Sequence, residues 1–95
     1  MSERFDEIRT RILANDERIV AAVNERLELV RELWRLKVEL GAERVDRERE
    51  RALRAALAET NAGPLSPAGL DRLVTALLDL TKQELAPAPR ERDEP

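Results

Sequence analysis

The feature that most constrains this chain is a long stretch free of helix-breaking residues. No Pro or Gly occurs between Glu3 and Leu40, and Gly41 follows as a natural stop. Apolar residues recur in this stretch at spacings of three and four, or their sums, which is the period of an α-helix. The pattern predicts one helix of about 36 residues, about 54 Å long. These apolar residues are Phe5, Ile8, Ile12, Ile19, Val23, Leu27, Val30, Leu33, Trp34 and Leu40.

A helix of this length predicts a homodimer. A compact domain of this size has a diameter of about 30 Å, so the helix is longer than its own domain. The rest of the chain is too short to cover the apolar stripe along its whole length, whereas a second copy can cover it. The alternative is a bend or break near Asn15-Asp16, which would divide the helix into two shorter ones.

Two shorter helices are expected after Gly41. Asp46 is a good N-cap for a helix that starts at Arg47 and ends near Glu59. A turn follows at residues 60–64. Ser66 and Pro67 are a strong start signal for a third helix.

Pro87 ends the third helix and opens a segment that is rich in Pro and charged residues. We therefore expect an all-α fold, with one very long N-terminal helix and two shorter ones in each chain. Residues 1–86 form the domain, and residues 87–95 form a disordered tail.

The composition excludes several kinds of chemistry. The chain has no Cys and no His, which removes thiolate nucleophiles, sulfur-bound metals and the usual proton shuttle. We expect neither a metal nor a cofactor. The net charge is −3 with acidic and basic residues interleaved, which argues against a nucleic-acid binder. Since no apolar run has the length of a membrane span and the N-terminus lacks an apolar signal region, we expect a cytoplasmic protein.

Arg26 and Lys37 interrupt the apolar stripe of the first helix. They are eleven residues apart and therefore point within about 20° of each other. Cations on an apolar face can bind an anion, but they can also extend their heads into water or pair with Glu25 or Glu32. Arg9 points about 100° away from Arg26, so it fits a site in the partner subunit of an antiparallel dimer.

Three further residues have ordinary structural explanations. Arg47 and Glu48 stand in the first turn of the second helix, where the helix dipole favours an exposed Glu. Thr81 lies on the apolar face of the third helix, where a Thr hydroxyl often bonds back to the preceding turn.

Together these residues resemble the AroQ family of all-helical chorismate mutases, over roughly residues 5 to 85. The resemblance rests on IRTRILANDERIVAAVNERLELVRELWRLK, VDRERERAL and LSPAGLDRLVTALLDLTKQEL. It implies an intertwined homodimer and an isomerase that converts chorismate to prephenate without a cofactor, in aromatic amino acid biosynthesis.

The resemblance also implies a role for each cation of the long helix. Arg9 corresponds to the arginine that reaches across the dimer to one substrate carboxylate, and Arg26 to the arginine that binds the other carboxylate in its own subunit. Lys37 corresponds to the lysine that faces the ether oxygen whose bond breaks.

The other implied site residues come from the shorter helices. Arg47 and Glu48 correspond to the family's Arg-Glu pair, in which the Glu accepts a hydrogen bond from the substrate hydroxyl. Thr81 falls where the family often has Ser or Thr near a carboxylate.

Two positions depart from the family pattern. The family has an aspartate three residues before the Arg-Glu pair, but Arg44 stands there and the aspartate is at Asp46. The family also has Gln or Glu one turn after the third-helix hydroxyl, where this chain has Leu85. Gln83 and Glu84 point about 200° and 100° away from that direction. Either the register of the match is off by one residue here, or Lys37 works with less help, which predicts a lower turnover.

Two alternatives stay open. One is a related enzyme on the same fold, such as an isochorismate pyruvate lyase or an aminodeoxychorismate mutase, although the Arg47-Glu48 pair favours the mutase. The other is a non-catalytic or regulatory helical dimer, which Arg44 and Leu85 support. A generic coiled coil is disfavoured, because the apolar pattern is not a strict heptad and two prolines break the chain.

Overall fold

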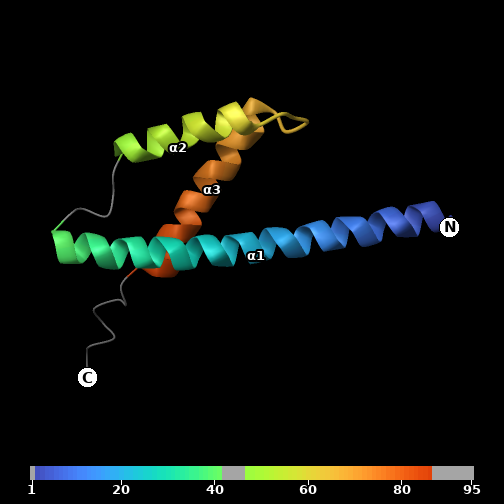
Figure 1. Cartoon of the computed structure of the whole chain (residues 1–95). Coiled ribbons are helices and arrows are strands. Elements are labelled where there is room, and N and C mark those ends of the chain that lie inside the picture. Colours follow the sequence, from blue (N-terminus) through green and yellow to red (C-terminus); the bar gives the residue numbers. More distant parts are fainter. Residues whose placement is uncertain (1, 42–46, 87–95) are drawn as a thin grey trace, which may run out of the picture.

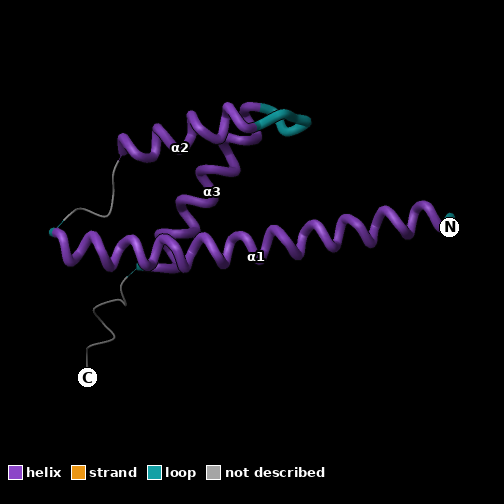
Figure 2. Tube along the Cα trace, viewed as in Figure 1, coloured by secondary structure: helices purple, strands orange, loops and turns teal. Residues whose placement is uncertain are grey.

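The computed structural model describes residues 2–41 and 47–86 of the chain. These residues form three α-helices and no strand (Figure 2). Helix α1 is Glu3–Leu40, α2 is Arg47–Thr60 and α3 is Pro67–Leu85. The predicted all-α fold with one long helix and two shorter ones is confirmed. Arg44, Asp46 and the segment 87–95, on which predictions were made, lie outside the described residues.

Helix α1 runs for 38 residues without interruption, so the alternative break at Asn15-Asp16 does not occur. Its first turn is capped by the side chain of Ser2, which accepts a hydrogen bond from the N–H of Phe5 at 3.0 Å. Gly41 ends the helix with φ at 74°, and its N–H bonds to carbonyls of the last turn. The two signals that bound the helix are therefore local ones.

Helix α3 begins as the sequence predicts. The Ser66 side chain accepts a hydrogen bond from the N–H of Gly69 at 3.0 Å, and Pro67 occupies the first helical position. In the turn before it, the Asn61 side chain donates to the carbonyl of Leu65 at 2.9 Å. These bonds fix the direction in which the chain reverses between α2 and α3.

Helix α3 joins the other two helices, because it packs against both α1 and α2 (Figure 1). On the α2 side, Arg54 makes an ion pair of 2.6 Å with Asp71 and donates to the hydroxyl of Thr75 at 3.0 Å. Among the described residues only Val74 and Thr81, both in α3, are buried. The centre of the fold is therefore α3, and α1 and α2 lie on either side of it.

The N-terminal half of α1 extends beyond the other two helices (Figure 1). The chain is 58 Å long and has a radius of gyration of 17.9 Å, against about 12 Å for a compact domain of this size. No residue of α1 is buried. A single copy therefore leaves a large apolar surface in water, which is unfavourable. The large exposed apolar side chains of α1 are Phe5, Ile8, Ile12, Leu13, Ile19, Val20, Leu29, Leu36, Val38 and Leu40.

None of the three described helices is both long enough and apolar enough to cross a lipid bilayer.

Candidate functional site

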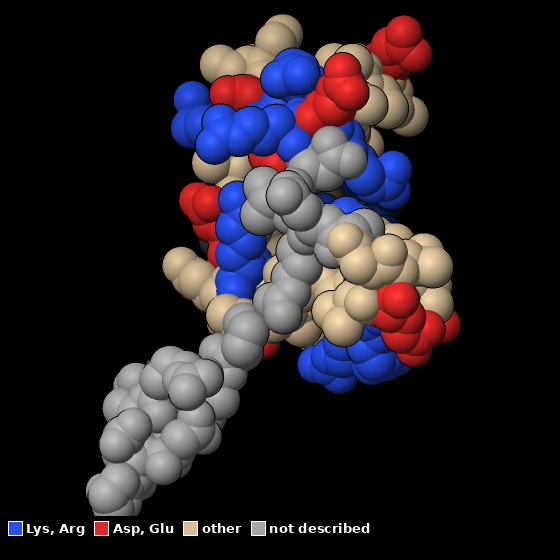
Figure 3. Space-filling model, turned by 90° about the vertical axis from the view of Figure 1, so that its left-hand side faces the viewer, with Lys and Arg blue, Asp and Glu red and all other residues tan. Residues whose placement is uncertain are grey.

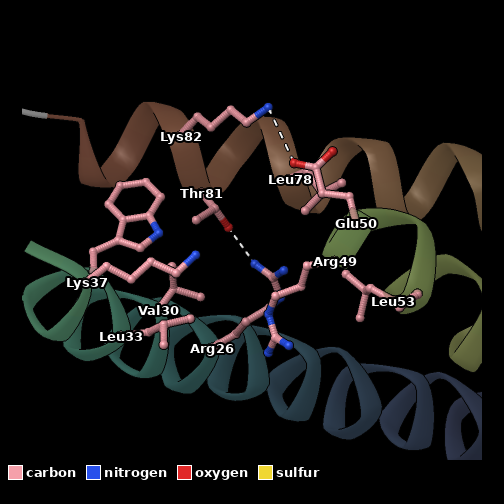
Figure 4. A pocket seen from close by; sticks show the side chains of 12 residues that line it. Arg26, Val30, Leu33, Lys37, Arg49, Glu50, Leu53, Leu78, Thr81 and Lys82 are labelled. Atoms are coloured by element: carbon pink, nitrogen blue, oxygen red, sulfur yellow. Dashed lines mark hydrogen bonds and ion pairs between the residues drawn. The ribbon is translucent and has the colours of Figure 1, made fainter. Parts of the chain in front are cut away.

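A pocket of about 390 Å³ opens where the C-terminal half of α1 faces α2 and α3 (Figure 4). This volume is in the range of pockets that hold small molecules. Apolar side chains form much of its wall, and a few charged side chains point into it. The lining residues are Arg26, Val30, Leu33, Trp34, Lys37, Arg49, Glu50, Ala52, Leu53, Leu78, Thr81 and Lys82.

Helix α1 contributes Arg26 and Lys37 to this pocket, together with Val30 and Leu33 between them. The helical period predicts that these four residues share one face, and in the structure that face is the floor of the pocket (Figure 4). Arg26 and Lys37 are both half-buried. The two cations therefore lie close to apolar surface instead of projecting into open water.

Thr81 of α3 fixes the position of Arg26. The Arg26 guanidinium donates a hydrogen bond to Thr81 Oγ1 at 2.5 Å, and Thr81 Oγ1 donates to the carbonyl of Leu77 at 2.8 Å. The hydroxyl proton is used within the helix, which leaves the oxygen lone pairs for the guanidinium. The back-bond expected of a helical Thr is therefore present and also aims the oxygen at Arg26. Within the described residues Arg26 bonds to α3 and makes no ion pair with Glu25, which was one of the alternatives.

Helix α2 contributes Arg49 and Glu50 to the pocket, and not Arg47 or Glu48. Directions around α2 can be measured from Leu53, which faces the pocket. Arg49 and Glu50 point about 40° and 60° from Leu53, on either side of it. Arg47 and Glu48 point about 120° and 140° away. Arg47, Glu48 and Arg49 are exposed, whereas the side chain of Glu50 is 30% exposed. The structure therefore brings the second Arg-Glu pair to the site instead of the first.

Sequence reasoning missed Arg49 and Glu50 because the segment reads RERER at positions 47–51. An Arg-Glu pair can start at either of two positions in such a repeat. Two signals favour the second. Leu53 marks the apolar side of α2, and Arg49 and Glu50 lie on that same side of the helix. Asp46 also stands three residues before Arg49, which is the spacing of the family pattern.

Lys82 is a third lining residue that the sequence pattern did not single out. It lines the pocket from α3, and its Nζ lies 3.8 Å from Glu50 Oε2. With Lys82 included, the lining residues carry four cations and one carboxylate. The chain as a whole has a net charge of −3, so this pocket is a local region of positive charge that favours an anionic ligand.

Basic side chains also extend over the outside of the molecule. Figure 3 looks from the side that lies at the left of Figure 1 and shows Lys and Arg side chains over much of this face, with fewer acidic ones among them. Basic side chains are therefore exposed on this face, with acidic and uncharged ones between them.

Arg9 and Leu85 do not line this pocket. Arg9 lies in the N-terminal half of α1, about 25 Å along the helix axis from Arg26. Its guanidinium carbon is 5.5 Å from the centroid of the Phe5 ring. Leu85 lines a separate cavity of about 400 Å³ on α1 and the end of α3. Glu84 lines that same cavity, and Gln83 lines neither one.

Comparison with known proteins identifies a family for the whole helical region. A family model described as chorismate mutase type II matches residues 8–84 of the chain. This range includes every residue that lines the pocket. No protein with a curated description matches the chain.

Proposed function

The chain belongs to the chorismate mutase type II family, and we propose that it is an isomerase that converts chorismate to prephenate. One observation carries this proposal. A single pocket in the family-matched region contains cations from all three helices and a single lining carboxylate. Chorismate is a small molecule with two carboxylates and one ring hydroxyl, so the charges of the pocket complement those of the substrate.

The proposed reaction suits the composition of the chain. Within one chorismate molecule, the ether C–O bond breaks while a C–C bond forms, and no atom is gained or lost. The rearrangement needs no acid, base, nucleophile or cofactor, and the chain has neither His nor Cys. Catalysis then depends on holding the compact conformer and on stabilising the charge that grows on the ether oxygen.

The lining residues have distinct roles in this proposal. Arg26, held by Thr81, binds one carboxylate with the two parallel hydrogen bonds that a guanidinium can make. The Lys37 ammonium faces the ether oxygen and stabilises it more in the transition state than in the ground state. Glu50 accepts a hydrogen bond from the ring hydroxyl, and Arg49 adds positive charge beside it. Arg49 and Glu50 take the roles that sequence reasoning gave to Arg47-Glu48.

We propose further that two copies form the functional unit. On α1, Ile8, Ile12 and Ile19 are exposed and point within about 40° of one another, and Arg26 and Lys37 share the same sector. A second copy that covers this stripe therefore also comes near the pocket. In such a homodimer, Arg9 of one copy binds the second carboxylate in the site of the other copy.

A subunit-mixing experiment tests the role of Arg9. Arg9→Ala and Lys37→Ala subunits are each expected to be inactive as homodimers. In an equal mixture about half of the dimers are mixed, and each mixed dimer has one complete site. The mixture should therefore recover about a quarter of the wild-type activity. No recovery in mixtures that contain verified heterodimers would place Arg9 and Lys37 in the same subunit's site.

The proposed activity is tested by incubating the purified chain with chorismate and identifying the product. Formation of prephenate above the uncatalysed rate supports the mutase. Pyruvate release from isochorismate, without prephenate from chorismate, would instead favour the lyase that shares this fold. The second candidate is a non-catalytic dimer. It is supported by Leu85, which stands at the position where the family has Gln or Glu. That candidate predicts no turnover and no binding of a bicyclic dicarboxylate that mimics the transition state.

A further inference from the structure

Two neighbouring residues of α3 each contact a charged side chain of a different helix. Thr81 accepts a hydrogen bond from Arg26 of α1, and Lys82 makes an ion pair with Glu50 of α2 (Figure 4). Two consecutive residues of α3 therefore contact the Arg26 guanidinium on one wall of the pocket and the Glu50 carboxylate on another. The first of these contacts belongs to the site already proposed, whereas the second has no role in it so far.

We propose that Lys82 is a positioning residue for the substrate hydroxyl, an inference that rests on the proposed mutase function. Its ammonium holds one oxygen of the Glu50 carboxylate. The other carboxylate oxygen then accepts the hydrogen bond from the ring hydroxyl of chorismate. A carboxylate has two oxygens and about four acceptor positions, so it serves both partners at once.

The surroundings of Glu50 explain why it needs such a partner. Besides Lys82, three cations line the same pocket as the Glu50 carboxylate, and two of them are proposed to bind the substrate. A Glu side chain that has lost Lys82 can turn toward Arg26 or Lys37 and reduce the positive charge available to the dianion. Lys82 belongs to α3, whereas Arg26 and Lys37 belong to α1. Its ion pair with Glu50 therefore keeps the carboxylate away from these two cations.

A purely structural role accounts poorly for this ion pair. Its 3.8 Å separation is long, and the side chain of Lys82 is 50% exposed, so solvent screens its contribution to stability. Another ion pair already joins the same two helices, because Arg54 and Asp71 are 2.6 Å apart. The Arg54–Asp71 pair lies outside the pocket, since neither residue lines it. It therefore provides a matched control for the loss of an α2–α3 ion pair.

The experiment compares Lys82→Met, Lys82→Arg and Asp71→Asn with the wild type on two substrates, chorismate and an analogue that lacks the ring hydroxyl. We expect Lys82→Met to lower kcat/KM for chorismate about tenfold, because a misplaced acceptor no longer meets the hydroxyl. Lys82→Arg should retain most of the activity, and Asp71→Asn should match the wild type. On the analogue, Lys82→Met and the wild type should agree within about twofold, because the interaction that Lys82 supports is missing there.

A double variant separates action through Glu50 from direct contact with the substrate. If Lys82 acts through Glu50, then Lys82→Met should cause no further loss in a Glu50→Gln background. An equal loss on both substrates, or additive losses in the double variant, would show that Lys82 does not act through Glu50 and would overturn the inference. Wild-type activity in Lys82→Met would also overturn it. Absence of turnover by the wild-type chain would overturn the proposed function and, with it, this role of Lys82.

Discussion

The Arg26 guanidinium and the Thr81 hydroxyl are joined by a hydrogen bond of 2.5 Å that links α1 to α3. Thr81 is 5% exposed, and its own proton is donated to the carbonyl of Leu77. Arg26 is therefore oriented before any ligand enters the pocket. Such preorganisation lowers the entropic cost of binding a carboxylate in one defined geometry.

Replacement of Thr81 by Val tests this relationship, because it removes the acceptor while it keeps the shape of the side chain. A hydrogen bond to a charged group is worth about 1.5 to 3 kcal/mol. We therefore expect kcat/KM for chorismate to fall by about tenfold or more. Thr81→Ser should restore most of the loss, since it returns the hydroxyl. Full activity in Thr81→Val would mean that Arg26 needs no anchor on α3.

The assignment of the α2 carboxylate is tested by two matched variants. Glu50→Gln should reduce kcat/KM about a hundredfold, because the amide is a weaker acceptor for the substrate hydroxyl and leaves the pocket with one negative charge fewer. Glu48→Gln should stay within about twofold of the wild type, since Glu48 is exposed and does not line the pocket. The opposite ranking would return the role to Arg47-Glu48.

Much of the fold was predictable because its signals are local. The stretch without breakers, the glycine stop at Gly41 and the Ser66-Pro67 start each act within a turn or two of helix. The α1 part of the site was equally accessible. Arg26 and Lys37 lie on one continuous helix, so its period alone gives their relative direction.

The α2 and α3 parts of the site depend on packing between helices, which the sequence does not encode as simply. A shift of two residues along α2 turns the Arg-Glu pair by about 200°, and the RERER repeat allows both registers. Which pair faces the pocket is decided by the way α2 packs on α3. Lys82 meets Glu50 across 32 positions of sequence, and neither residue stands out until the two helices are placed side by side.

Leu85 gives a prediction that separates structure from family pattern. The pattern suggests that Leu85→Gln would supply a missing donor for the ether oxygen and raise the rate. In the structure Leu85 lines the other cavity, beside Val38 and Glu84. We therefore expect Leu85→Gln to change kcat by less than about threefold, because the introduced amide would not reach the substrate's ether oxygen, which Lys37 faces. A rise of about a hundredfold would mean that α3 turns toward the pocket in the active assembly.

The apolar stripe of α1 predicts a dimer that one buried charge can disrupt. Ile12→Glu places a carboxylate on the stripe and should shift the chain toward monomer with loss of activity, because burying an unpaired charge is costly. Thr10→Glu adds the same charge about 160° round the helix and should leave the dimer intact. Sedimentation velocity measures both. An active monomer in the wild-type chain would contradict the shared site.

Lys37 is the residue on which the proposed chemistry depends most, and the rate of prephenate formation by Lys37→Ala tests it most directly. Arg35→Ala, which removes a cation that does not line the pocket, serves as the control and should keep near-normal activity. We predict that Lys37→Ala keeps the helical content and dimer mass of the wild type but loses about a thousandfold or more in kcat. A folded Lys37→Ala dimer that still forms prephenate at close to the wild-type rate would contradict the assignment of this pocket as the mutase site.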